Sequence, residues 1–224
     1  MVVEHSISDQ VFDWIQIAGL GCLICFFIAR WAMLHNRGVQ VVVVDETRTT
    51  THVLSDLLLM ACMLLWGATV FAYAWPLQTL AGSSSLNVVL LDMILIKVLG
   101  ALAVTAGLLI YVLALRAFGQ SWRVGIDRHK PGPLVAQGVF SWTRNPIYVS
   151  LELFIFGTFL MEGMMIHLVL ALLIVGMTHS LILREEQFLR ETYGETYREY
   201  CRRVRRYLNW RVVNQRSGDI LGLD

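Results

Sequence analysis

Apolar residues gather in five long runs that alternate with polar segments. The runs cover residues 12–34, 53–75, 88–115, 147–161 and 165–183. A helix needs about 20 apolar residues to cross a hydrocarbon core of about 30 Å. The pattern therefore predicts an all-α integral membrane protein with about five transmembrane helices.

The fourth and fifth runs are joined almost without a linker. Glu162 and Gly163 form the only plausible turn between them, which predicts a tight helical hairpin. The first arm has 15 residues and would be about 22 Å long. Because this length is short for a full crossing, we expect the hairpin to tilt or to pack against protein rather than lipid.

Composition supports a membrane protein and excludes several other classes. Apolar residues make up 56% of the 224 residues and charged residues 16%, against about 45–50% and about 25% in soluble domains. The formal net charge of +1 gives no support for nucleic-acid binding. Cys22 and Cys25 form a CxxC pair inside an apolar run without a second ligand pair, so we predict no metal site.

The basic residues predict the orientation of the chain. With five crossings, residues 35–52, 116–146 and 184–224 lie on one side and hold 16 of the 18 Lys and Arg residues. The loops on the other side hold none. Basic loops face the cytoplasm in most membrane proteins, so we expect the N-terminus outside and the C-terminus in the cytoplasm.

The polar segment before the fourth run ends in Asn145-Pro146. Prolines and glycines between residues 131 and 138 make a continuous helix there unlikely. Pro146 then stands at the favoured first position of a helix, with Asn145 as the capping residue. One interpretation is a well-made cap only. The other is that the positive end of this helix binds an anion such as a carboxylate.

Two adjacent carboxylates, Glu185 and Glu186, follow the last apolar run. They point about 100° apart on a helix, so they cannot both face one partner. Either one faces a pocket, or both belong to a solvated helix in which Glu186 pairs with Arg190. Further along, Gly194 is expected to break the helix locally. One face of the helix around it carries a leucine and three tyrosines at helical spacing: Leu189, Tyr193, Tyr197 and Tyr200.

Ionisable residues inside the apolar runs are further candidates for a site. Lys97 lies in the third run, and Asp92 is five positions away and so off its helical face. Lys97 is equally compatible with a buried pair and with a site. Glu152, near the inner end of the fourth run, is expected to line a cavity. His179 stands about two helical turns before Glu186 and is either a hydrogen-bonded buried histidine or a base.

The order of these motifs resembles a known family. Residues 134–148 follow the pattern Leu-Val-x-x-Gly-x-(Tyr/Phe)-x-x-x-Arg-(His/Asn)-Pro-x-Tyr, and after the hairpin come Glu185-Glu186-x-x-Leu189 and then Tyr193-Gly194-x-x-Tyr197-x-x-Tyr200. This is similar to the isoprenylcysteine carboxyl methyltransferases and their bacterial relatives, in a clan that includes phospholipid and thiol methyltransferases. The resemblance covers about residues 116–210.

The resemblance implies transfer of a methyl group from S-adenosylmethionine, bound at the cytoplasmic end of the last helices. The cofactor-binding residues that it implies are Leu134, Val135, Phe140, Asn145, Pro146, Ile147, Tyr148 and Glu185. The charge of Arg144 suits the carboxylate of the cofactor. A general base is left open among Glu186, His179 and Glu152, and a thiolate or carboxylate acceptor would need none.

The expected acceptor is a small lipophilic carboxylate, thiol or amine that enters from the bilayer. On this hypothesis residues 1–115 are N-terminal membrane helices and residues 116–224 form the catalytic region, in a membrane that the Asn145-Pro146 variant suggests is a bacterial inner membrane. Two alternatives stay open. One is a reductase of the sterol-reductase type that uses NADPH, and the other is a small membrane carrier without enzymatic activity.

Overall fold

The computed structural model of the chain describes residues 7–38, 49–74, 88–119 and 132–208. This part of the chain is all-helical, as the apolar runs predict. The α-helices are α1 (Ile7–His35), α2 (Thr50–Ala74), α3 (Ile94–Phe118), α4 (Pro146–Glu162) and α5 (Met165–Arg203). One short 3-10 helix, η3 (Gly138–Ser141), precedes α4. Pro76, which the sequence suggests as the end of the second helix, lies outside the described residues.

Four of these helices are long and apolar enough to cross a membrane: α1, α2, α3 and α5. The remaining predicted crossing, the fourth apolar run, forms α4. This helix has 17 residues and is therefore about 25 Å long. Most of its residues are buried against other helices, including Val149, Phe154 and Phe159. The short arm of the hairpin thus packs against protein, as its length suggests.

The third helix begins later than its apolar run. Residues 88–93 are apolar but not helical, because their backbone pairs with the turn between α4 and α5. The amide of Leu90 donates to the carbonyl of Gly163 at 2.7 Å, and the amide of Met165 donates to the carbonyl of Val88 at 2.9 Å. The prediction of a helix from residue 88 is therefore wrong: tertiary hydrogen bonds replace the helical ones at this end.

The helical hairpin turns at Gly163, as predicted, and only glycine fits there. Its φ of +66° lies in the left-handed region, which is typical of the residue after a helix end. A Cβ atom at this position would lie 1.8 Å from the carbonyl oxygen of Leu91. The turn and the extended segment before α3 are thus in direct backbone contact.

Close glycine contacts hold α3 against α4, the most extensive helix pair of the fold. A Cβ atom at Gly157 would lie 2.7 Å from the carbonyl oxygen of Gly100, and one at Gly107 would lie 2.7 Å from that of Ser150. Small residues let two backbones approach in this way, which is how helices associate in a membrane that offers no hydrophobic driving force.

We predict that Gly157→Ala destabilises the protein although alanine is the better helix former. The added methyl group must push α3 and α4 apart, and overpacking of this kind costs about 1–3 kcal/mol. Gly21→Ala is the matched control, because no atom lies within 4 Å of a Cβ there. Thermal unfolding in detergent measures both. Equal unfolding midpoints for the two variants would contradict the close packing.

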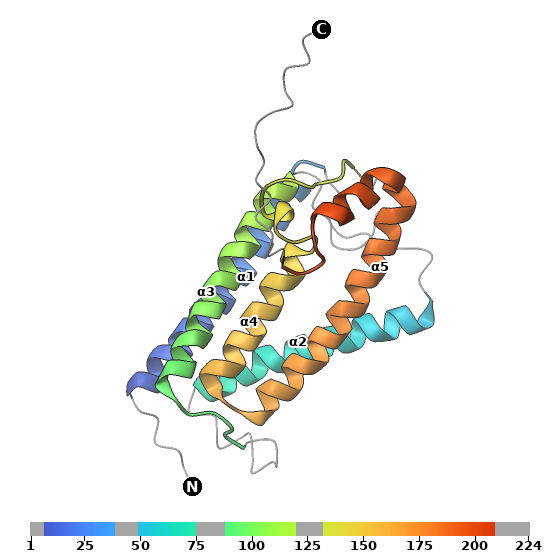
Figure 1. Cartoon of the computed structure of the whole chain (residues 1–224). Coiled ribbons are helices and arrows are strands. Elements are labelled where there is room, and N and C mark those ends of the chain that lie inside the picture. Colours follow the sequence, from blue (N-terminus) through green and yellow to red (C-terminus); the bar gives the residue numbers. More distant parts are fainter. Residues whose placement is uncertain (1–6, 39–48, 75–87, 120–131, 209–224) are drawn as a thin grey trace.

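The helices do not form a simple parallel bundle. In Figure 1, α1, α3, α4 and the first part of α5 run in roughly the same direction, while α2 crosses behind α4 and α5. α5 bends at Gly194 (φ 53°, ψ −122°), as the sequence predicts. Its last turns fold back over the beginning of α4 (Figure 1). The beginning of α4, the ends of α1 and α3 and these last turns of α5 therefore lie together, and we call this the basic end of the molecule.

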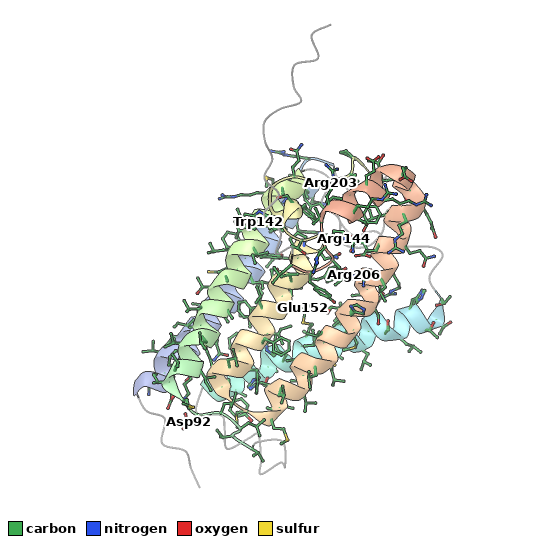
Figure 2. All side chains as sticks on the ribbon, in the orientation of Figure 1. Asp92, Trp142, Arg144, Glu152, Arg203 and Arg206 are labelled. Atoms are coloured by element: carbon green, nitrogen blue, oxygen red, sulfur yellow. The ribbon has the colours of Figure 1, made fainter. Side chains whose placement is uncertain are left out.

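Lys97 forms an ion-pair group at the opposite end, in which Asp92 is exposed. Its Nζ atom lies 2.5 Å from Asp9 Oδ1 and 2.8 Å from Asp92 Oδ1. The expectation that Asp92 is off the face of Lys97 is wrong, because Asp92 precedes the first residue of α3 and its segment is extended. This group is far from the basic end, where the other candidate residues gather (Figure 2).

Candidate functional site

The candidate site forms where the chain after α5 returns to the start of α4. The amide of Arg144 donates to the carbonyl of Arg205 at 3.1 Å, and the hydroxyl of Thr143 donates to the carbonyl of Arg206 at 3.0 Å. In Figure 2 the labelled Arg144 and Arg206 lie between the start of α4 and the end of α5. Residues 204–208 thus form a strap across the basic end of the molecule.

Glu186 is the centre of this contact. Its side chain is 1% exposed and lies within reach of three arginines. Arg206 makes two hydrogen bonds to it, from Nε to Oε1 at 3.0 Å and from Nη2 to Oε2 at 2.9 Å. Arg144 Nη2 lies 3.3 Å from Oε1, and Arg190 Nη2 lies 3.2 Å from Oε2. The pair with Arg190 that the sequence suggests is present, but Glu186 is buried rather than solvated.

The charge balance of the cluster affects the pKa of Glu186. α5 has 39 residues and is about 58 Å long, so its charged part after Leu183 extends beyond the membrane core. Burial raises the pKa of Glu186, but the hydrogen bonds from Arg206 and the charges of Arg144 and Arg206 outweigh burial, and the net pKa is below its ordinary value. Glu186 is thus held as a carboxylate, with three cations around one anion.

Asn145 stands at the predicted cap position but does not cap the helix with its side chain. Its side-chain Nδ2 atom instead donates to the carbonyl of Arg206 at 3.1 Å and, more weakly, to Glu186 Oε1 at 3.4 Å. The interpretation of Asn145 as only a well-made cap is therefore wrong. The first turn of α4 keeps its positive end without a side-chain acceptor from Asn145, next to the guanidinium of Arg144.

Glu185 faces a different partner from Glu186, as the helical geometry requires. Its half-buried carboxylate accepts a hydrogen bond from the hydroxyl of Tyr148, in the first turn of α4. Burial raises the pKa of Glu185, the charge of Glu186 raises it further, and the bond from Tyr148 opposes both. Beside it, Arg184 pairs with Asp56 of α2 at 2.5 Å. Glu185, the first residue of the carboxylate pair, thus links α5 to α4, and the ion pair of Arg184 with Asp56 links α5 to α2.

An apolar wall supports the segment between η3 and α4. Phe140 is buried and packs edge-on against Phe118 of α3, with ring centroids 4.7 Å apart. Its carbonyl accepts a 2.7 Å hydrogen bond from the hydroxyl of Tyr200. Val135 packs with Phe140 against α3, whereas Leu134 packs with the tyrosines of α5. The helix face that the sequence predicts, with Leu189, Tyr193, Tyr197 and Tyr200, lies in that second cluster.

Glu152 of α4 and His179 of α5 lie about one to two helical turns further from the basic end than Tyr148 and Glu185. Glu152 Oε1 accepts a hydrogen bond from the hydroxyl of Thr178 at 3.2 Å. His179 Nδ1 shares a 2.6 Å hydrogen bond with the hydroxyl of Tyr207, and the two rings stack. Burial raises the pKa of Tyr207, and the negative charge of Glu152 raises it further. Tyr207 therefore stays protonated and brings the strap into contact with His179.

The structure brings most candidate residues to one place. Asn145 and Arg144 meet Glu186, Tyr148 meets Glu185, and Glu152 and His179 lie below them. Phe140, Val135 and Ile147 lie in apolar packing against α3, and Pro146 is buried. Leu134 lies in the separate cluster with the tyrosines of α5. Within the described ranges, no group of three His, Cys, Asp or Glu residues could hold a metal ion.

Sequence reasoning missed Arg206 and Tyr207. Both lie after the end of α5, in the strap. The basic stretch Arg202–Arg206 is visible in the sequence, but the direction in which the chain turns after a helix is not. The signal that could have found Arg206 is charge: a buried carboxylate needs cations, and the basic stretch is the nearest supply.

The fold and the site define the class of protein as a helical integral membrane protein with a polar, arginine-rich site at one end. Residues 95–196 match the model of the phospholipid methyltransferase family, which belongs to the isoprenylcysteine carboxyl methyltransferase-like clan. The match begins in α3 and includes every candidate site residue that the sequence suggests, from Leu134 to Glu186. A comparison with curated proteins found no match. The domain supports a membrane methyltransferase, as the resemblance implies.

Proposed function

We propose that the protein transfers a methyl group from S-adenosylmethionine to a small lipophilic acceptor at the cytoplasmic face of the membrane. The observation that carries the proposal is the contact between Tyr148 and Glu185, next to the helix start at Asn145-Pro146 and within the matched methyltransferase domain. It joins the two motifs that the resemblance assigns to the cofactor, although they are separated by a helical hairpin.

The residues at the basic end fit the charged groups of this cofactor. The first turn of α4 and Arg144 offer positive charge for its carboxylate. The Nε atom of Arg144 is buried and has no hydrogen-bond partner among the described residues, so it needs an acceptor such as a water molecule or a ligand. Glu185 and the hydroxyl of Tyr148 suit the amino group or the ribose. Phe140, Leu134 and Ile147 offer apolar surface for adenine.

An apolar cavity near Glu152 could take the tail of the acceptor. It has a volume of about 210 Å³ and lies between α1, α2 and α4. Leu151, Phe154 and Ile155 line it from α4, and Met63 and Trp66 from α2. The entry route in this proposal is from the lipid, between the helices.

The bound cofactor would supply an electrophilic methyl group on a positively charged sulfur. The bond from that sulfur to the methyl carbon breaks, and a bond from the acceptor atom to the carbon forms, with the electron pair left on the sulfur. The chain's own task is to align the two reactants and to exclude water. An acceptor that carries a proton must lose it, and Glu152 Oε1 and the ring of His179 are the groups that could take it. We assign Glu186 a positioning role, because both of its carboxylate oxygens are already bonded to arginine.

Tyr207→Phe is expected to lower kcat about tenfold, the loss of one hydrogen bond to His179. The KM for S-adenosylmethionine should stay unchanged, because Tyr207 touches the proposed acceptor side only. Steady-state kinetics measures both, with an acceptor identified by the methyl-transfer experiment of the next paragraph. Tyr193→Phe is a control that removes a hydroxyl bonded to the carbonyl of Gly132, away from His179. An unchanged kcat for Tyr207→Phe would exclude its proposed role.

The test of the proposed function is methyl transfer by purified protein. The protein, in lipid nanodiscs, is incubated with S-adenosylmethionine labelled in its methyl group and with lipophilic thiols, acids and amines in turn. We expect label in the lipid extract with at least one acceptor class. Turnover of NADPH with no methyl transfer would favour the reductase alternative, and transport of solutes in proteoliposomes with neither activity would favour a carrier.

The cellular location follows from the same proposal. The four membrane-spanning candidates establish a membrane protein, and the basic loops favour the cytoplasm for the basic end. We propose a bacterial inner membrane with the C-terminus in the cytoplasm, where S-adenosylmethionine is made. Labelling of cysteines introduced at residue 199 in intact cells would test this orientation, since Glu199 is exposed at the basic end.

A further inference from the structure

A second groove lies on the other side of the basic end, between α1 and α3. It has a volume of about 180 Å³. Its α1 wall consists of Phe26, Ala29, Arg30 and Met33, whose spacing of three, four and seven places them on one helical face. Its α3 wall consists of Val112, Leu115 and Arg116, again at spacings of three and four. The groove is thus mostly apolar and lies between two membrane helices, with an arginine on each wall.

Both arginines are near the ends of their helices, where a membrane helix meets the lipid headgroups. Arg116 is two residues before the end of α3, and Arg30 is five residues before the end of α1. Phe26 and Val112 lie further from those ends, on the side of the hydrocarbon core. The groove therefore has an apolar part at the depth of acyl chains and a cationic part near the headgroups.

Among the described residues, neither guanidinium group is paired with an anion. Arg30 donates a hydrogen bond to the carbonyl of Gly119, but its Nε atom is buried without a partner. Arg116 is exposed, and among the described residues no carboxylate pairs with either arginine. The positive charge of Arg37 also acts on Arg30. Three positive charges next to one apolar groove are electrostatically costly unless an anion shares the site.

We propose that this groove binds one anionic phospholipid, with the phosphate between Arg30 and Arg116 and an acyl chain along Phe26, Val112 and Leu115. Basic pockets between membrane helices recognise anionic headgroups in this way. A zwitterionic lipid offers the same chains but carries a compensating cation, so the charge selects the anionic class. The groove is separate from the proposed methyltransferase site, which lies between α4 and α5, and the inference does not depend on that function.

Lipid binding to the purified protein tests the proposal. Phosphatidylglycerol and phosphatidylcholine with identical chains are titrated into detergent-solubilised protein, and bound lipid is counted by native mass spectrometry. We expect phosphatidylglycerol to bind about 25-fold tighter than phosphatidylcholine, since each of the two arginines near the surface is worth about fivefold. Inorganic phosphate alone should not compete at millimolar concentration, because it lacks the apolar contacts.

Variants separate the groove from general surface charge. Arg116→Gln should weaken phosphatidylglycerol about fivefold and leave phosphatidylcholine unchanged, and it is the safest variant because Arg116 has no described partner. Arg30→Lys should keep most of the preference, whereas Arg30→Gln should reduce it about fivefold. Arg198→Gln, at an exposed arginine paired with Glu195, is the control. Equal binding of the two lipids, or an equal loss in Arg198→Gln, would overturn the proposal. Thermal unfolding, measured in the same samples, shows whether each variant is folded.

Discussion

Glu186→Gln is expected to destabilise the protein more than any other single substitution at the basic end. The amide keeps the shape of the side chain but removes the negative charge that Arg144, Arg190 and Arg206 share. Removing one partner from a buried charge cluster costs about 3–5 kcal/mol, because the remaining charges stay buried without compensation. In a chain of this size the unfolding midpoint should fall on the order of 10 °C.

A matched control for Glu186→Gln lies on the same helix. Glu195 pairs with Arg198 and Arg202, but all three side chains are more than half exposed. Exposed ion pairs contribute about 0–1 kcal/mol, so Glu195→Gln should leave the midpoint almost unchanged. Thermal unfolding of both variants in the same detergent makes the comparison. Similar midpoints would mean that the strap does not hold Glu186 as described.

The pH dependence of stability gives a second check on Glu186. Its pKa is lower in the folded protein than its ordinary value of 4.5. A carboxyl group of this kind stabilises the fold above the ordinary pKa, and the stabilisation is lost as the pH falls through the folded-state pKa. The difference between wild type and Glu186→Gln should therefore be full at neutral pH and should shrink below about pH 4.5. A constant difference across this range would contradict the ion-pair cluster.

Glu185→Ala is expected to have the largest effect on ligand binding. The substitution removes the carboxylate that Tyr148 contacts and that the proposed function assigns to the cofactor. Hydrogen bonds to a charged group are worth about 1.5–3 kcal/mol, so the Kd for S-adenosylhomocysteine should rise roughly 10- to 100-fold. The fold should be retained, because Glu185 is half-buried and is not part of the arginine cluster.

Glu199→Ala is the control for this substitution. Glu199 is an exposed carboxylate on the last turns of α5, close to the basic end but outside the site. Its removal should leave the Kd unchanged. If both variants bound equally well, the assignment of Glu185 to the cofactor would be wrong. If Glu185→Ala bound weakly only because it was unfolded, its melting curve would show this directly.

Much of the fold is present in the apolar runs. Long runs predict helices because a membrane leaves the backbone no other way to satisfy its hydrogen bonds, and Gly163 and Gly194 mark a turn and a bend by chemistry that other residues lack. The start of α3 was not predictable in this way. Val88 and Leu90 are as apolar as the helix that follows, and only their hydrogen bonds to a turn more than 70 residues later keep them extended.

The candidate site was predictable as a set of motifs but not as a set of contacts. Glu185 and Glu186 are adjacent on a helix, so the sequence predicts that they face different partners, and they do. The identity of those partners depends on where the strap lies. Arg206 reaches Glu186 because the chain reverses after α5, and Asn145 bonds to the strap instead of capping its own helix. Local patterns carry no information on either contact.

The division into residues 1–115 and 116–224 stays a prediction, and the matched domain begins before that boundary, within α3.

The central claim is that the start of α4 and Glu185 bind S-adenosylmethionine. Calorimetric titration of the detergent-purified protein with S-adenosylhomocysteine tests it most directly, because it requires no knowledge of the acceptor. We predict one site per chain with micromolar affinity, weakened in Glu185→Ala and in Tyr148→Phe and unchanged in Glu199→Ala. Absence of binding in wild-type protein with a cooperative melting curve would contradict the claim, and NADPH would then be the next ligand to titrate.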